Sequence, residues 1–312
     1  MGEWSKKVGE AGESIAAEFL RLIGWDAAQA GVELPCVRPE GHKVSGHARR
    51  THGIDYLHAY RSPLVDGVAQ NLIISVKFSA QPYPKNPIRV FKEHFCDLAQ
   101  TIECFKNSEI RRTVSQTIKG VAKTQDIGVL LWLNNDRETE GDVVGQLGRV
   151  VLPDTLNYEA IYLVDNKRAR FVFDSVNYAN RVANGCEVEF FYPDTGKNIN
   201  PLCSVKHGRM LPVEYVNSSV LALRIADKAS ERRTLVITTL EGFSEAGLKR
   251  LLGLAQQLSQ DWCSKVIVAF PDFDPLHHSN TVQLAKGCFS NASFANAAEM
   301  HCYDEDFRTL RH

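Results

Sequence analysis

The 312-residue sequence lacks several features that would point to a specialised class of protein. No apolar run approaches the roughly 18–20 residues of a membrane-spanning helix, and Met1–Lys7 contains no apolar segment typical of a secretory signal. Neither an internal repeat nor a low-complexity tract occurs, and the 44% hydrophobic and 23% charged composition excludes collagen-like and largely disordered chains. We therefore expect a cytoplasmic globular protein that has no membrane partner.

Several common chemical motifs are also missing. The eight cysteines (36, 96, 104, 186, 203, 263, 288 and 302) form no C-x-x-C pair, which is typical of reduced, mostly buried thiols and predicts no structural zinc site. Four histidines (42, 47, 52 and 58) follow at intervals of five, five and six, which match no common metal-binding spacing, so we interpret them as phosphate-contacting or loop residues. No G-x-x-x-x-G-K-[ST] or G-x-S-x-G occurs, so the sequence indicates neither a P-loop motor nor an α/β-hydrolase.

The sequence has little net charge, −1 from 36 basic and 37 acidic residues, so a nucleic-acid site has to be local. Between Arg38 and Lys123, however, 14 Lys or Arg stand against seven acidic residues. Cations beside a reacting phosphate hold the nucleic-acid backbone. We expect such contacts from Lys43, Arg49, Arg50, His52, Arg111, Arg112 and Lys119. The alternative is a solvated basic loop and helix surface.

Hydrophobic periodicity predicts the first half of the fold. Apolar residues at helical spacing predict a helix over 8–24 that ends at Gly24. Two strands, over 53–60 and 71–79, are separated by a short loop and predict a hairpin. A long helical region over 88–124, with a break near Asn107 or Gly120, precedes an apolar run over 127–133 that is typical of a strand buried on both faces.

The polar, glycine-containing segment 134–148 is the best candidate for a domain boundary. We expect one domain over 1–145 and a second α/β domain, for recognition or assembly, over 146–312. Strand-like pieces follow the boundary at 160–164, 169–173 and 187–192. A clearer β-α-β unit then comprises a strand over 234–239, a helix over 244–257 and a strand over 265–270.

Polar residues at three points of the first domain predict a site. Ser75 and Lys77 share one face of an otherwise apolar strand. A lysine at such a position is expected either at a solvent-exposed edge or beside a ligand. On the first helix, Glu13 borders the apolar stripe, so its carboxylate can lean over the sheet. Together with Asp55 on the preceding strand, these side chains could meet at one metal ion and one phosphate.

The residues around this site resemble a known family. Gly9-Glu10-Ala11-Gly12-Glu13 through Leu20, followed by Gly24-Trp25, resembles the first helix of the Holliday-junction-resolvase and type IV restriction branches of the PD-(D/E)xK nuclease superfamily. Gly53-Ile54-Asp55 is similar to the G-x-D strand of that superfamily, and Ser75-Val76-Lys77 stands where (D/E)-x-K is expected. The resemblance covers about residues 5–135 and implies an α/β fold with an N-terminal αβββαβ restriction-endonuclease-like core.

The resemblance also implies an activity. It implies an endonuclease that depends on Mg²⁺ or Mn²⁺ and hydrolyses phosphodiester bonds of DNA. It also implies a role in bacterial anti-phage defence or restriction. Asp55 would be the main metal ligand, Glu13 and the Val76 carbonyl would supplement it, and Lys77 would orient the attacking water and stabilise the transition state. Ser75 replaces an acidic residue of the motif, which leaves the site one carboxylate short.

Two alternatives stay open. The fold could serve as a catalytically inactive nucleic-acid-binding or scaffold subunit, which Ser75 would favour. A small-molecule enzyme could instead use Asp272 and His277, which follow an apolar strand where α/β proteins place ligand sites. For a nuclease joined to a second domain of this size we expect a partner protein subunit or a homo-oligomer.

Overall fold

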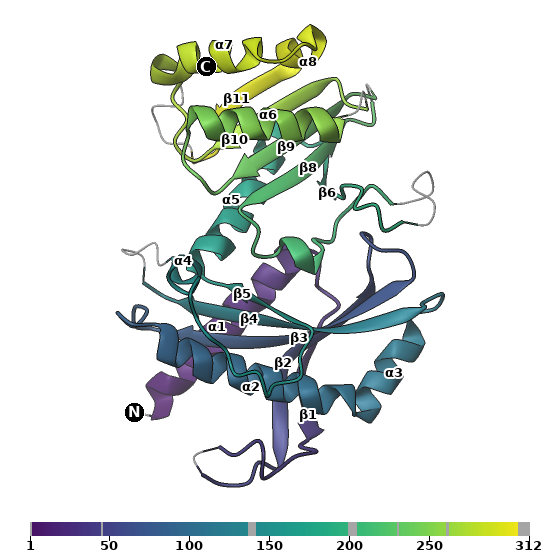
Figure 1. Ribbon diagram of the computed structural model, residues 1–312, viewed down its shortest axis with the longest axis vertical. Coiled ribbons are helices and arrows are strands. Elements are labelled where there is room, and N and C mark those ends of the chain that lie inside the picture. The colour runs from purple at the N-terminus through teal and green to yellow at the C-terminus, as the bar shows by residue number, and fades with distance from the viewer. Residues whose placement is uncertain are drawn as a thin grey trace. The chain divides into compact units, whose positions relative to one another are not determined.

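The computed structural model describes residues 2–44, 46–136, 142–198, 205–229, 231–259 and 262–304. The chain forms two compact units. The main part of the first unit ends at Ala169 and is joined by Pro212–Asn217, whereas the second includes Arg170–Asp194 and the chain from Ser218 onward. Figure 1 shows a sheet with covering helices in each unit. Among the described helices, none combines the length and apolarity that crossing a membrane requires.

The first unit contains a five-stranded sheet in the order β1-β2-β3-β4-β5. Strands β1, β2 and β3 pair antiparallel, and β3, β4 and β5 pair parallel. Its elements are α1 (Gly2–Leu22), β1 (Gln29–Pro35), β2 (Thr51–Arg61), β3 (Val68–Ser79), α2 (Ile88–Lys106), α3 (Glu109–Thr117), β4 (Lys123–Asn134), α4 (Val143–Gln146), β5 (Ala160–Val164) and the short 3₁₀ helix η2 (Val213–Tyr215). The chain order α1-β1-β2-β3-α2-α3-β4 confirms the predicted αβββαβ core, in which the single helix before the last strand is replaced by the pair α2 and α3.

Strand β4 forms the centre of this core. The run over 127–133 is apolar throughout because β4 lies between two parallel strands and its faces are covered by helices. Helix α2 packs its apolar residues, among them Phe95, Leu98 and Ile102, against one face of the sheet. Helix α1 packs against β3, where Gly12 lies directly over Phe78. Since Phe78 and Lys77 alternate along β3, α1 and α2 cover opposite faces of the sheet.

The predicted long helical region is two helices. It breaks at Asn107, where the Ser108 side chain accepts a hydrogen bond from the Arg111 amide at 3.1 Å and caps the start of α3. The residues after Thr117 are not helical, and β4 begins at Lys123. The helix predicted to end near Thr124 therefore ends earlier, because the chain has to enter the central strand.

The first unit extends past residue 145. Strand β5 pairs with β4 along Ile127–Leu131, so the sheet is completed by residues that we assigned to the second domain. Helix α5 (Asn166–Ala183) begins directly after β5 and includes the division between the units at Ala169. Part of this helix was predicted as a strand over 169–173, which is wrong. Its buried residues, such as Val172, Val176 and Ala179, recur at helical spacing over a longer window.

The second unit contains a mixed six-stranded sheet in the order β11-β10-β9-β8-β6-β7. Besides most of α5, its elements are β6 (Glu187–Phe191), β7 (His207–Gly208), β8 (Val220–Ala226), β9 (Arg233–Thr239), α6 (Glu245–Ser259), β10 (Lys265–Phe270), α7 (Pro275–Gly287), α8 (Ala292–Ala297) and β11 (Ala298–Cys302). The predicted β-α-β unit is confirmed, since β9 and β10 pair parallel and the apolar face of α6 packs over them.

Candidate functional site

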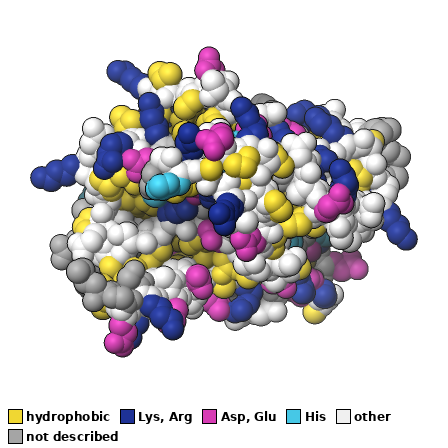
Figure 2. Space-filling view, turned by 90° about the horizontal axis from the view of Figure 1, so that it is seen from below, with side chains coloured by type: hydrophobic (Ala, Val, Ile, Leu, Met, Phe, Trp, Pro, Cys, Tyr) yellow, Lys and Arg dark blue, Asp and Glu magenta, His cyan; other side chains and the backbone are white. Residues whose placement is uncertain are grey.

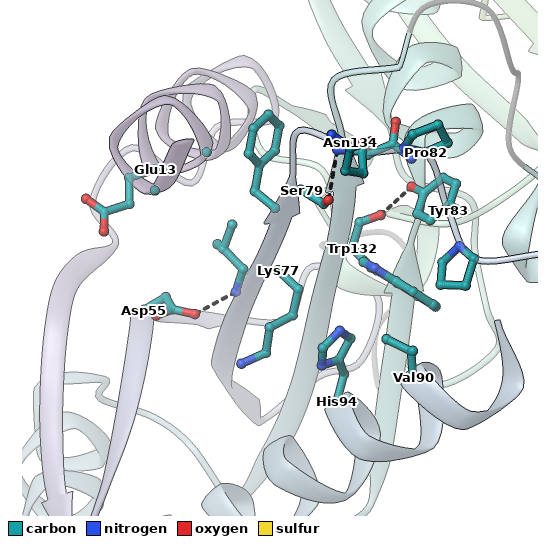
Figure 3. Close-up of a pocket in the computed structure, with 16 residues that line it drawn as sticks. Glu13, Asp55, Lys77, Ser79, Pro82, Tyr83, Val90, His94, Trp132 and Asn134 are labelled. Atoms are coloured by element: carbon teal, nitrogen blue, oxygen red, sulfur yellow. Dashed lines mark hydrogen bonds between the residues drawn. The ribbon is translucent and has the colours of Figure 1, made fainter. Parts of the chain in front are cut away.

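A pocket of about 570 Å³ lies in the first unit at the carboxyl ends of β3 and β4. Glu13 from α1, Asp55 from β2, and Val76 and Lys77 from β3 all line it. Figure 3 shows Glu13 and Asp55 on one side of the pocket, Tyr83 and Trp132 on the other, and Lys77 between them. The structure therefore brings together four residues that lie on three separate elements.

Asp55 lies where β2 and β3 separate. The ladder between these strands ends at the Tyr56–Ile74 pair, and one residue further the Asp55 Oδ2 atom accepts a hydrogen bond from the Val76 amide at 2.6 Å. The side chain thus replaces a main-chain partner and fixes the carboxylate at the mouth of the pocket. A hydrogen bond from an N–H to a carboxylate is stronger than one between neutral groups, so it orients Asp55 well.

Lys77 is held from the opposite side by helix α2. Its Nζ atom lies 3.3 Å from the Asp97 Oδ2 atom, and the Asp97 Oδ1 atom accepts a hydrogen bond from Arg49 Nη1 at 2.5 Å. Burial of Asp97 alone would raise its pKa, but the hydrogen bond from Arg49 and the charge of Lys77 outweigh this effect, so its pKa lies below the usual value. Asp97 is therefore an ionised carboxylate that positions two cations at the edge of the pocket.

Asp97 and His94 are not among the site residues expected from the sequence. His94 lines the pocket one turn before Asp97, and burial together with the nearby Lys77 charge lowers its pKa. The imidazole contacts the ring of Trp132 edge to face at 5.4 Å. A signal was present, because both polar residues stand beside the apolar stripe of α2, next to Phe95 and Leu98.

The far wall of the pocket is built by a hydrogen-bond network around Tyr83. The Tyr83 hydroxyl donates to the Trp132 carbonyl at 2.5 Å and accepts from the Asn166 amide at 3.0 Å. The Asn166 side chain in turn donates to the Asn134 carbonyl at 3.0 Å. These bonds join the loop before α2 to the ends of β4 and β5, so three segments of the chain are connected where the sheet ends.

Ser75 does not share the pocket with the other motif residues. It lies on the same face of β3 as Lys77, but it is only 8% exposed and is not among the residues that line the pocket. At this point the pocket offers the carboxylates of Glu13 and Asp55 and the backbone of Val76.

Three of the four histidines are buried, which differs from the surface loop positions expected for them. His52 is completely buried, with its ring nitrogens facing other side chains, so the expected phosphate contact is corrected for this residue. His42 and His58 are also buried, at 3% and 7% exposed, and burial lowers the pKa of His58 to about 4. His47 alone among the four histidines is exposed.

The expected nucleic-acid-binding residues divide into two groups. Arg49 reaches the pocket edge through Asp97, and Lys43 and Arg50 are exposed on the same loop, where Lys43 pairs with Glu40. The other group, Arg111, Arg112 and Lys119, lies on and after α3 at the far end of α2.

The structure does not bring this second group to the pocket. Arg111 donates at 2.7 Å to the buried Asp126 carboxylate, near the amino end of β4. Asp126 precedes the pocket residue Trp132 by six strand residues, or about 20 Å. Arg112 pairs with Glu109 on its own helix. On the face in Figure 2, basic and acidic side chains are interspersed over the described surface.

The polar residues of the alternative site around Asp272 make hydrogen bonds that stabilise a loop and a helix start. The Asp272 Oδ1 atom accepts a hydrogen bond from the Phe243 amide at 2.7 Å. Asp274 caps the start of α7 by accepting from the Leu276 amide, and its other oxygen faces His277, which is exposed. These side chains terminate a loop and begin a helix.

Comparison with known proteins agrees with the geometry of the first pocket. The family described as the GAPS4 protein PD-(D/E)XK nuclease domain matches residues 1–168. The chain belongs to this family. The match covers the sheet from β1 to β5 and ends one residue before Ala169, so it coincides with the main part of the first unit. No curated protein and no solved structure matches the chain significantly.

PD-(D/E)XK nucleases generally use divalent metal ions, and the pocket residues fit such an ion. Mg²⁺ and Mn²⁺ prefer oxygen ligands, and the residues that line the pocket include the two carboxylates, Glu13 and Asp55, together with Val76, whose main chain has a carbonyl oxygen. The site has one carboxylate fewer than the motif provides, since Ser75 stands where a further acidic residue is expected. Two carboxylates with main-chain oxygens and water are nevertheless an ordinary ligand set for Mg²⁺.

Proposed function

We propose that this protein is an endonuclease that hydrolyses phosphodiester bonds of DNA with Mg²⁺ or Mn²⁺. The single observation that carries the proposal is the shared pocket of Glu13, Asp55 and Lys77, with Asp97 behind the lysine. The site combines acidic ligands with a cation, as phosphate hydrolysis requires.

In this proposal each residue has a distinct task. Asp55 and Glu13 hold the metal ion, with help from the Val76 carbonyl, and the bound ion offsets negative charge on the phosphate and acidifies water. Lys77 donates to the phosphate oxygens or to the attacking water, and its ammonium stabilises the extra negative charge of the transition state. Asp97 is a positioning residue, because it holds the Lys77 ammonium at 3.3 Å without lining the pocket. Arg49 and the exposed Lys43 and Arg50 bind the nucleic-acid backbone beside the pocket.

The test measures DNA cleavage by variants of the three pocket residues and by a control variant on helix α1. Asp55→Ala and Lys77→Ala should abolish Mg²⁺-dependent DNA cleavage, while the circular-dichroism spectrum and a cooperative melting transition show that each variant is folded. Glu13→Gln should raise the Mg²⁺ concentration needed for half-maximal cleavage, because it removes one ligand. Glu10→Gln is the matched control, since Glu10 is exposed one turn earlier on α1, where it pairs with Lys6. An Asp55→Ala protein that cut DNA as well as the parent would refute the proposal.

The second candidate is a non-cleaving nucleic-acid-binding or scaffold subunit, and the buried Ser75 favours it. It predicts that the parent protein cuts neither double-stranded, single-stranded nor branched DNA with either metal ion. Ser75→Glu restores the acidic residue of the motif. Cleavage that appears only in this variant would support the inactive subunit, whereas cleavage by the parent excludes it.

The biological setting belongs to the same proposal. The resemblance and the family together favour a cytoplasmic role in bacterial anti-phage defence or restriction. We assign recognition or assembly with a partner subunit or a second copy to the second unit, because it has its own sheet and core and contributes no residue to the pocket. Size-exclusion chromatography with light scattering, together with co-purification from the native host, tests this assignment.

A further inference from the structure

Four side chains from distant parts of the first unit meet at one buried point. Cys36 follows β1, His42 lies in the loop after it, His52 is on β2 and Cys104 is on α2. Each offers one ligand atom, and the four atoms all lie within 4.8 Å of one another. The side chains are between 0% and 9% exposed. None of them lines the candidate nuclease pocket.

The distances between the four atoms match the edges of a tetrahedron around zinc. The two Sγ atoms are 3.9 Å apart, and His42 Nδ1 and His52 Nε2 are 3.3 Å apart. His42 Nδ1 lies 3.4 Å from Cys36 Sγ and 3.5 Å from Cys104 Sγ. His52 Nε2 lies 3.3 Å from Cys104 Sγ. Tetrahedral bonds of about 2.3 Å to sulfur and about 2.05 Å to nitrogen require edges of about 3.8, 3.3 and 3.6 Å for the three kinds of pair.

The groups outside the cluster orient both imidazoles for metal binding. The other nitrogen of His42, Nε2, faces the Glu103 carboxylate at 3.3 Å, and the other nitrogen of His52, Nδ1, faces the Thr101 hydroxyl at 3.2 Å. Thr101 donates its own hydrogen to the Asp97 carbonyl, so its oxygen is free to accept from His52. With these partners, His42 carries its ring hydrogen on Nε2 and His52 carries its ring hydrogen on Nδ1. The lone pairs of His42 Nδ1 and His52 Nε2 then face each other across the cluster. A cation between them resolves this arrangement.

The surroundings also suit two thiolates. The Val37 amide donates to Cys104 Sγ at 3.4 Å, which stabilises negative charge on the sulfur. Two thiolates, two neutral imidazoles and one Zn²⁺ carry no net charge, so the assembly can be buried without an unpaired ion. Beyond it, Arg38 pairs with Glu103 at 2.7 Å and balances the carboxylate that holds His42.

We propose that Cys36, His42, His52 and Cys104 form a structural Zn²⁺ site. Binding replaces the two thiol hydrogens by Zn–S bonds and releases two protons, with no change of oxidation state. The ion ties the loop over 36–52 to helix α2, and this loop carries Arg49, whose guanidinium meets Asp97 two turns before Cys104. The site therefore fixes the basic loop beside the pocket. Four protein ligands complete the tetrahedron, which is typical of a structural rather than a catalytic zinc ion.

The test measures metal in the full-length protein. Protein purified without chelator and supplied with Zn²⁺ should contain about one zinc per chain by plasma mass spectrometry. Cys36→Ser and Cys104→Ser should lose it, and each should melt at a lower temperature. Cys96→Ser is the matched control, because Cys96 lies on the same helix outside the cluster and its variant should keep the metal.

Two further measurements keep the proposal testable if the serine variants fail to fold. Co²⁺ in place of Zn²⁺ should give the intense visible absorption of a tetrahedral site with two thiolates. His42→Cys should retain about one zinc per chain, since three cysteines and one histidine also bind zinc. Parent protein that takes up no zinc, or that loses two hydrogens in a Cys36–Cys104 disulfide, would overturn the proposal.

Discussion

Replacing Asp97 by asparagine tests how helix α2 positions Lys77, the lysine to which we assign a catalytic role. The carboxylate holds Arg49 at 2.5 Å and Lys77 at 3.3 Å, and asparagine keeps its shape while removing its charge. The variant leaves two cations close together without the anion between them. Lys77 is then free to adopt other rotamers, so we expect DNA cleavage to fall by about tenfold or more, in line with a misplaced catalytic group.

The magnitude of the stability loss follows from the exposure of the pair. A hydrogen bond to a charged group contributes about 1.5–3 kcal/mol when buried, and an exposed ion pair contributes about 1 kcal/mol or less. The Asp97 side chain is 35% exposed and Lys77 is 30% exposed, so each contact belongs between these limits. We expect Asp97→Asn to lower the free energy of unfolding by about 2 kcal/mol. For a unit of this size that corresponds to roughly 4–8 °C in melting temperature.

The pH dependence gives an independent check. Because the pKa of Asp97 is lower in the folded protein than its ordinary value of 3.8, its stabilising effect is complete above that value and is lost as the pH falls through the folded pKa. The difference between parent and variant should therefore be constant from about pH 7 to pH 5 and should shrink in more acidic buffer.

The assay is urea unfolding followed by circular dichroism at several pH values, alongside cleavage kinetics. Glu93→Gln is the matched control, since Glu93 is on the same helix in an exposed pair with Arg89 and should change stability by less than about 0.5 kcal/mol. An Asp97→Asn protein as stable and as active as the parent would refute the positioning role. A stability difference that persisted in acid would refute the electrostatic explanation.

Two further predictions concern the packing of the first unit. Gly12→Ala should destabilise the protein by about 1–3 kcal/mol in urea unfolding, because a Cβ there would come within 2.5 Å of Phe78 Cβ. Gly9→Ala is the control and should be neutral or stabilising, because a Cβ at Gly9 would meet no atom within 4 Å. Equal effects of the two substitutions on stability would contradict this account. Arg111→Ala should cost about 3 kcal/mol, since it removes the cation from an Asp126 carboxylate that is 1% exposed, and a variant as stable as the parent would show that this pair contributes nothing.

Local pattern was sufficient for most of the fold. The apolar run over 127–133 and the alternation over 71–79 identified β4 and β3 correctly, because strand periodicity depends only on neighbouring residues. The segment over 169–173 failed for the same reason, since a five-residue window of α5 cannot show the helical spacing. The domain division near residue 145 missed β5, which is short and is defined by its pairing with β4.

For the site, the sequence by itself determined the motif residues. Glu13, Asp55 and Lys77 were predicted from their order, their strand and helix faces, and a family resemblance, and whether they act as predicted is for the variants to decide. What lies around them was decided by the tertiary structure. Asp97 faces Lys77 only because α2 packs across β3, 20 residues later in the chain.

The cysteines and histidines show the same limit most clearly. Their spacing predicted no zinc site, yet residues 36, 42, 52 and 104 meet because β1, β2 and α2 pack against one another. Contacts between residues far apart in the chain depend on how elements pack, and no short window of sequence contains that information. The sequence alone determined the motif and most elements of the first unit, and only the tertiary structure decided which polar groups share a buried space.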